Sequence, residues 1–159
     1  RPTADPQVYE FCDLHISMGG GPGGRSAAYG VTDLDSGNVL VVGWYGSNVE
    51  GIAVVWEVDP GWATTGEHDT EGTCVVEAKT LTTAGEAYDV AIVGDQVEAV
   101  GLDASSSSGQ PVRWLVATGA ATLLHDGQGE AYEINRTGLI VGQAKVKRTN
   151  HATLWIPNL

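Results

Sequence analysis

The sequence predicts an all-β protein made of three similar repeats, and three observations carry this prediction. An Ala-Tyr pair recurs at positions 28–29, 87–88 and 131–132. A Gly followed 13 residues later by a Trp recurs at positions 43 and 56, 101 and 114, and 142 and 155. The chain has 22 Gly, and its apolar residues are mostly Val, Ala, Leu and Ile, a usage that favours short strands and tight turns over helices.

Length and charge limit the possible functions. The 159 residues are enough for one domain with a real core. The formal net charge of -12, from 20 acidic and 8 basic residues, argues against binding to nucleic acid or to anionic membrane surfaces, which need a basic face. No apolar run approaches the ~20 residues of a membrane-spanning helix. The sequence therefore predicts neither a nucleic-acid partner nor membrane insertion.

The N-terminal residues 1–17 are expected to form an arm followed by an orphan strand. Residues 8–16 alternate apolar and polar along most of their length, which is typical of a strand with one buried face. That face would carry Val8, Phe11, Leu14 and Ile16. Cys12 lies in this segment, and the second of the two cysteines is Cys74. A disulfide between them is favoured over two buried free thiols, and it would imply an oxidising compartment.

The first repeat, residues 26–84, is expected to contain strands at 39–46, 52–58 and 75–81 and an inserted loop at 59–72. The distance from Trp56 to the next Ala-Tyr pair is 31 residues, whereas the distance from Trp114 to the pair after it is 17. About 14 residues are therefore inserted after Trp56. The loop carries Glu67, His68 and Asp69, weak candidates for a divalent cation, but no second His lies at ligand spacing. A solvated acidic loop is the favoured interpretation, and no metal or cofactor is predicted.

Two further segments in this region resemble ligand-binding motifs, but the residues around them do not fit those motifs. The glycines at 19, 21 and 24 have the G-x-G-x-x-G spacing, but a strand and not a helix is expected after them. The acidic turn at 33–38 lacks the ligands of an EF-hand at the required positions, since these are Gly37 and Trp44. Both segments are expected to be loops or turns.

The second repeat, residues 85–128, is expected to have strands at 87–93, 96–103, 111–117 and 122–125. The third, residues 129–159, would stop before an outer strand, and the orphan strand 8–16 would complete it, within one chain or between two. The residues repeated in every copy are expected to form the core: Tyr29, Gly43, Trp56, Tyr88, Gly101, Trp114, Tyr132, Gly142 and Trp155. The only basic cluster, Lys145, Lys147 and Arg148, is a candidate contact with another subunit.

The third repeat resembles a known family. The pattern A-Y-x-I-N-x-x-G-x-I-V-G at 131–142, followed by H-A-x-L-W at 151–155, is similar to the HAF repeat of secreted bacterial and archaeal proteins. This copy keeps His151 and Ala152 but has Thr153 where the family has Phe. The resemblance implies a β-propeller-like array of four-stranded blades, here three, in an extracellular or cell-surface protein without catalytic residues. Three blades could form half of a six-bladed ring, and the alternative fold is a β-trefoil.

Two functional hypotheses follow, and neither is an enzyme. The sequence shows no paired acid and base, metal triad or activated nucleophile. The first hypothesis is a structural module that assembles with itself into a dimer, fibre or surface array by strand complementation. The second is a carbohydrate-binding, lectin-like module in which aromatic residues such as Trp44 and Tyr45 stack on the sugar rings of surface glycans.

Overall fold

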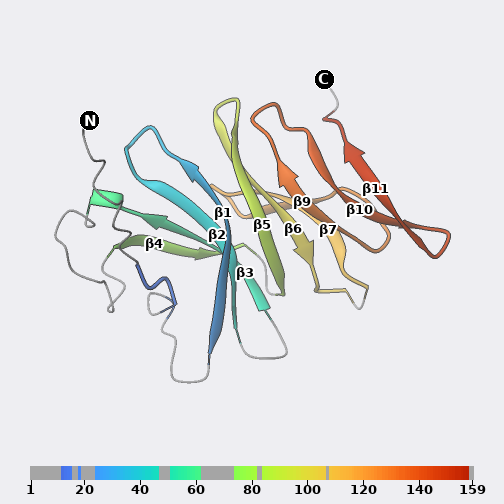
Figure 1. Ribbon diagram of the computed structural model, residues 1–159, viewed down its shortest axis with the longest axis horizontal. Helices are drawn as coiled ribbons and strands as arrows, with labels where there is room; N and C mark the ends of the chain where they lie inside the picture. The colour runs from blue at the N-terminus through green and yellow to red at the C-terminus, as the bar shows by residue number, and fades with distance from the viewer. Residues whose placement is uncertain are drawn as a thin grey trace, which may run out of the picture.

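In the residues that it describes, the computed structural model has eleven strands in three antiparallel sheets of four, four and three strands. It describes residues 12–15, 18, 24–46, 51–61, 74–81, 84–106 and 108–157. The sheets lie in a row in chain order (Figure 1). The all-β prediction is thereby confirmed.

Each repeat forms its own sheet, and its strands pair in the order in which they occur in the chain. Sheet 1 contains β1 (Arg25–Asp33), β2 (Val39–Gly46), β3 (Gly51–Val58) and β4 (Val75–Thr80). Sheet 2 contains β5 (Gly85–Val93), β6 (Gln96–Asp103), β7 (Gln110–Leu115) and β8 (Ala120–Leu123). Sheet 3 contains β9 (Gly129–Ile134), β10 (Ile140–Val146) and β11 (Thr149–Trp155). No described strand pairs with a strand of another repeat, so nothing in this pairing favours the trefoil alternative.

The outer strand of the second repeat begins two residues earlier than expected, at Ala120. The reason is the turn before it. Gly119 has a left-handed φ of 71°, and its amide donates a 2.8 Å hydrogen bond to the Leu115 carbonyl. The chain therefore reverses at once after β7, and Val116 falls in the turn instead of the strand.

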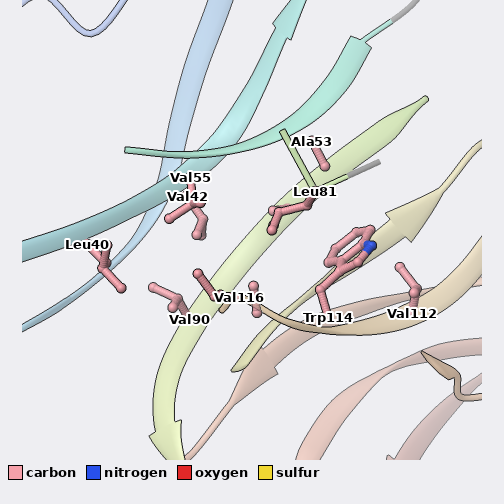
Figure 2. Packing of buried hydrophobic residues seen from close by; sticks show 11 residues of the cluster. Leu40, Val42, Ala53, Val55, Leu81, Val90, Val112, Trp114 and Val116 are labelled. Carbon is pink, nitrogen blue, oxygen red and sulfur yellow. The ribbon is translucent and has the colours of Figure 1, made fainter. Parts of the chain in front are cut away.

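Two hydrophobic clusters join neighbouring sheets. The first lies between sheets 1 and 2, and the fully buried Trp114 is its largest member (Figure 2). It is formed by Leu40, Val42, Ala53, Val55, Leu81, Ala87, Val90, Ala99, Val112, Trp114 and Val116. The second lies between sheets 2 and 3 and is formed by Ala91, Val100, Ala131, Ile134 and Ile140. Sheet 2 is thus covered on both faces.

The other face of sheet 1 is covered by the N-terminal segment. Cys12 forms the expected disulfide with Cys74, 62 residues away. Cys12, Leu14 and Met18 pack on a cluster that contains the buried Trp56. This burial gives the segment a structural role within its own chain.

The prediction of a strand over 8–16 is wrong where the structure can be compared with it. Cys12 makes a single bridge, and Leu14 and His15 lie in a turn. The Asp13 side chain accepts a 3.0 Å hydrogen bond from the His15 amide, the pattern of an Asx turn, and this bond bends the chain away from a strand. Val8, Phe11 and Ile16 of the expected assembly strand lie outside the described residues.

Candidate functional site

The three repeated tyrosines occupy β-bulges at the same place in the three sheets. The register of β1 with β2 shifts between Ala28 and Gly30, so Tyr29 is the extra residue. In the same way Tyr88 is the extra residue of β5, and Tyr132 that of β9. A bulge leaves one residue without a partner across the ladder and turns its side chain to a new direction. All three tyrosines are therefore redirected in the same manner.

The repeated glycines stand opposite these bulges. A Cβ on Gly43 would overlap the carbonyl oxygen of Ala27, and a Cβ on Gly101 would overlap that of Glu86. Gly142 has the same relation to the carbonyl of Glu130. The bulge brings this carbonyl so close that the partner strand has no room for a side chain. Tyr and Gly are thus two parts of one repeated device, which explains why they recur together.

The expected repeat core is confirmed only in part. Trp56 and Trp114 are fully buried, and Gly43 and Gly101 are buried as well. Trp155 and Gly142 are only partly buried, because β11 lies at the edge of sheet 3, which has three strands among the described residues.

The placement of the tyrosines in the core is wrong. Tyr29 is 51% exposed and Tyr132 is 41% exposed, while Tyr88 between them is partly buried. The bulges direct these side chains toward the surface, away from the interior that an unbroken alternation along the strand would predict.

The three rings form a continuous row across the sheets, called here the tyrosine row (Tyr29, Tyr88 and Tyr132). The ring centroids of Tyr29 and Tyr88 are 5.5 Å apart, and those of Tyr88 and Tyr132 are 6.0 Å apart. The planes are tilted by 59° and 47°, within the range of favourable aromatic pairs. The row therefore joins β1, β5 and β9, the first strands of the three sheets.

Hydrogen bonds fix the Tyr29 end of the row. The Trp44 indole Nε1 donates to the Tyr29 hydroxyl at 3.0 Å, and that hydroxyl donates to Glu86 Oε2 at 3.4 Å. The Tyr29 ring is thus held in place by neighbours from its own and the adjoining sheet.

The electrostatic environment of the row is negative. Burial raises the pKa of the Tyr88 phenol, and the carboxylates of Glu86 and Glu130 raise it further. The pKa of Tyr132 is also raised, by desolvation first and then by its hydrogen bond to Glu130 and the charge of that carboxylate. Both carboxylates therefore act on the middle of the row.

The raised pKa of Tyr88 gives a testable pH dependence. At about pH 11 ordinary tyrosines, with a pKa near 10, are mostly ionised, but Tyr88 is expected to stay protonated in the folded protein. The unfolded chain loses this proton first, so the contribution of Tyr88 to stability is present below pH ~10 and is lost as the pH rises further. In an ultraviolet titration, wild type and Tyr88→Phe should gain equal tyrosinate absorbance at that pH. One extra tyrosinate in wild type would contradict the assignment.

Trp44 and Tyr45, the aromatic residues proposed to stack on sugar rings, lie on opposite faces of β2. Trp44 joins the tyrosine row, whereas Tyr45 packs in the cluster under the N-terminal segment. The Tyr45 ring lies 5.2 Å from the ring of His15. Trp44 and Tyr45 therefore do not belong to one sugar-binding surface.

A cleft of about 620 Å³ opens between sheets 1 and 2. Leu40, Val55 and Val97 are among the apolar residues that line it. Glu57, Glu77 and Asp95 are its acidic lining residues. The Lys79 ammonium group crosses between the two sheets and donates to the carbonyls of Val116 and Ala117 at 2.7 and 2.8 Å. The only described lysine of the cleft is thus used to join the sheets.

The weak metal candidates cannot be placed, since Glu67, His68 and Asp69 lie outside the described residues. Within the part of the chain that the structure describes, no three His, Cys, Asp or Glu side chains are grouped to hold a metal ion. In the same part, no helix is long and apolar enough to cross a membrane.

Comparison with known proteins finds no matching family model, no matching curated protein and no matching solved structure.

Sequence reasoning missed Glu86, Glu130 and the exposure of the tyrosine row. One signal was available: Glu-Ala-Tyr occurs at 86–88 and again at 130–132, which places a carboxylate two residues before the bulged tyrosine in both repeats. The first repeat has Ala27 at that position. The tilt of the rings toward one another depends on how the sheets pack, which no single repeat encodes.

Proposed function

We propose that this protein is a non-enzymatic, extracellular assembly module. Its three sheets are consecutive blades of a β-propeller-like array, and sheet 3 binds a second copy of the chain. The blade interpretation is supported by the strand order within each sheet and by the first strands, since β1 contacts β5 and β5 contacts β9. The disulfide between Cys12 and Cys74 is consistent with an oxidising, extracellular location.

The observation that carries the assembly proposal is the uncovered outer face of sheet 3. A Val precedes the repeated Gly in every sheet. Val42 and Val100 are fully buried by the next sheet in the row, but Val141 is 42% exposed. Leu154, its direct partner across the strands, is 53% exposed, and Ile156 just beyond is 67% exposed. A surface that the first two sheets bury is therefore open on the third.

The edge of sheet 3 is open as well. In sheets 1 and 2 the third strand pairs with a fourth, β4 or β8, whereas β11 has no outer neighbour among the described strands. An unpaired edge strand exposes backbone donors and acceptors that another chain can bind. The described part of the N-terminal segment packs on sheet 1, so it does not supply this strand. A second copy would cover both the face and the edge.

Charge favours a second copy as the occupant. Residues 129–159 carry four basic residues (Arg136, Lys145, Lys147 and Arg148) against Glu130 and Glu133, a net charge of +2. The chain total is -12, so residues 1–128 carry -14. The third repeat of one copy is therefore electrostatically complementary to residues 1–128 of another, which favours their encounter.

The matched substitutions Leu154→Glu and Val76→Glu test this proposal in light scattering. Each replaces an exposed aliphatic residue on a strand with a carboxylate, one on sheet 3 and the other on β4, 60% exposed. Wild type and Val76→Glu are expected to associate with rising concentration, and added salt should weaken this association. Leu154→Glu should stay at the chain mass of 16.6 kDa. Equal association of both variants would refute a role of the sheet 3 face.

Carbohydrate binding remains the second candidate function, and one observation favours it. Tyr29 and Tyr132 present exposed aromatic surface beside hydrogen-bonding groups, a combination that can stack on a sugar ring. The pair of Trp44 and Tyr45 gives it no support, because these side chains lie on opposite faces of β2. A neutral sugar is therefore one of the ligands tested below.

A further inference from the structure

The tyrosine row has the chemistry of a binding surface for cations. The face of a phenol ring carries negative electrostatic potential and attracts a cation within about 6 Å of its centroid. The row presents three such rings side by side, two of them about half exposed. A ligand lying along it would meet the exposed rings of Tyr29 and Tyr132 with the partly buried Tyr88 between them.

Glu86 and Glu130 add two negative charges to this surface. Both precede a tyrosine of the row by two residues, on the adjoining strands β5 and β9, and both act on the Tyr88 phenol. Neither forms an ion pair with a described Lys, Arg or His. Two partly buried carboxylates without a cationic partner favour the arrival of a positive charge.

The donor set selects among cations. A divalent metal ion of the calcium type takes six to eight oxygen ligands, and the described residues hold no group of three His, Cys, Asp or Glu that could form such a site. An organic ammonium ion needs fewer direct ligands, because aromatic faces stabilise its methylene groups and its charge together. The row also spans three rings, with steps of 5.5 and 6.0 Å between ring centroids, so it suits an extended ligand.

We propose that the tyrosine row, with Glu86 and Glu130, is a binding site for extended aliphatic polyamines. Their methylene segments lie across the rings of Tyr29, Tyr88 and Tyr132, and their ammonium groups lie beside the two carboxylates. The site is complete within one chain, so it goes beyond the assembly function and does not depend on it.

Calorimetric titration of the intact chain with spermidine at about 0.15 M salt tests the proposal. Wild type is expected to bind, and Glu86→Gln/Glu130→Gln should bind at least tenfold more weakly. The matched control is Asp35→Asn/Glu77→Gln, which removes the same charge from exposed positions on the β1–β2 turn and on β4. This control should change the affinity less than twofold. Thermal unfolding of both double variants verifies that each is folded.

A second variant separates the contribution of the aromatic rings to binding from that of the carboxylates. Tyr88→Leu removes the middle ring and keeps both carboxylates, and it is expected to weaken spermidine binding about fivefold or more. If this variant does not fold, Tyr132→Leu at the exposed end of the row provides the same comparison.

Three results would overturn the proposal. The first is no spermidine binding, and the second is an equal loss of affinity in both charge variants, which would mean attraction to net charge alone. The third is binding of a neutral disaccharide as tight as that of spermidine, which would assign the row to sugars instead. Oligomeric state measured on the same samples keeps this outcome distinct from that of the assembly proposal.

Discussion

Gly101→Ala is expected to lower the free energy of unfolding by about 3 kcal/mol, at the upper end of the range for overpacking a buried position. The new Cβ would overlap the Glu86 carbonyl oxygen and approach Ala87 Cα to 2.9 Å. A backbone group cannot move aside as a flexible side chain can. Relief requires the β5 bulge to open, and this would displace Tyr88 from the middle of the row.

Urea unfolding followed by tryptophan fluorescence measures this change. The matched control is Gly94→Asn in the turn between β5 and β6. Gly94 has a φ of 64°, which Asn tolerates, and no atom lies within 4 Å of its Cβ position. The control is expected to cost less than about 1 kcal/mol. A loss for Gly101→Ala no larger than that of the control would show that the bulge does not need its opposing glycine.

Removal of the disulfide by Cys12→Ala/Cys74→Ala is expected to lower the free energy of unfolding by about 4 kcal/mol. The two cysteines are 62 residues apart in the sequence. A cross-link over a loop of this length lowers the conformational entropy of the unfolded chain, and the lost entropy corresponds to about 4 kcal/mol. The same change releases the segment that covers Trp56 and the outer face of sheet 1. A new apolar surface would then be exposed beside the one on sheet 3.

Thermal and urea unfolding with and without reductant test this prediction. Reductant should destabilise wild type by nearly the same amount as the double substitution and should leave the double variant unchanged. A wild-type protein whose unfolding is insensitive to reductant, with two titratable thiols in its native state, would contradict the role given to this bond.

Much of the fold could be predicted because the signals were local and repeated. The constant spacing from Gly43 to Trp56, and from the equivalent residues in the other repeats, reports a hairpin whose two strands must pair in one register. The observed pairs Val41 with Trp56, Ala99 with Trp114 and Ile140 with Trp155 show this common register. Strand ends followed from turn residues, and Gly119 shows how one left-handed residue moved an end by two positions.

The candidate site was harder to predict, because a residue type that recurs in every repeat can be either buried or exposed. A tyrosine equivalent to Tyr29 and a tryptophan equivalent to Trp56 occur in every repeat. In the first repeat, Trp56 is fully buried but Tyr29 is half exposed. The difference comes from the bulge, which turns the tyrosine side chain to the other face of the strand. In the sequence, the only sign of this bulge is the Gly on the partner strand. The prediction of an N-terminal strand is wrong for a different reason. Apolar and polar residues do alternate over most of 8–16, but the Asx turn at Asp13 and the disulfide hold residues 12–15 in another conformation.

The central claim is that a second copy covers the outer face and edge of sheet 3. Amide hydrogen exchange of the unmodified protein, compared between dilute and concentrated samples, tests it most directly because it locates the contact. Exchange in β10 and β11 is expected to slow as the concentration rises, while exchange in β8, the corresponding outer strand of sheet 2, stays the same. Association without any slowing in β10 or β11 would place the contact elsewhere and contradict the claim.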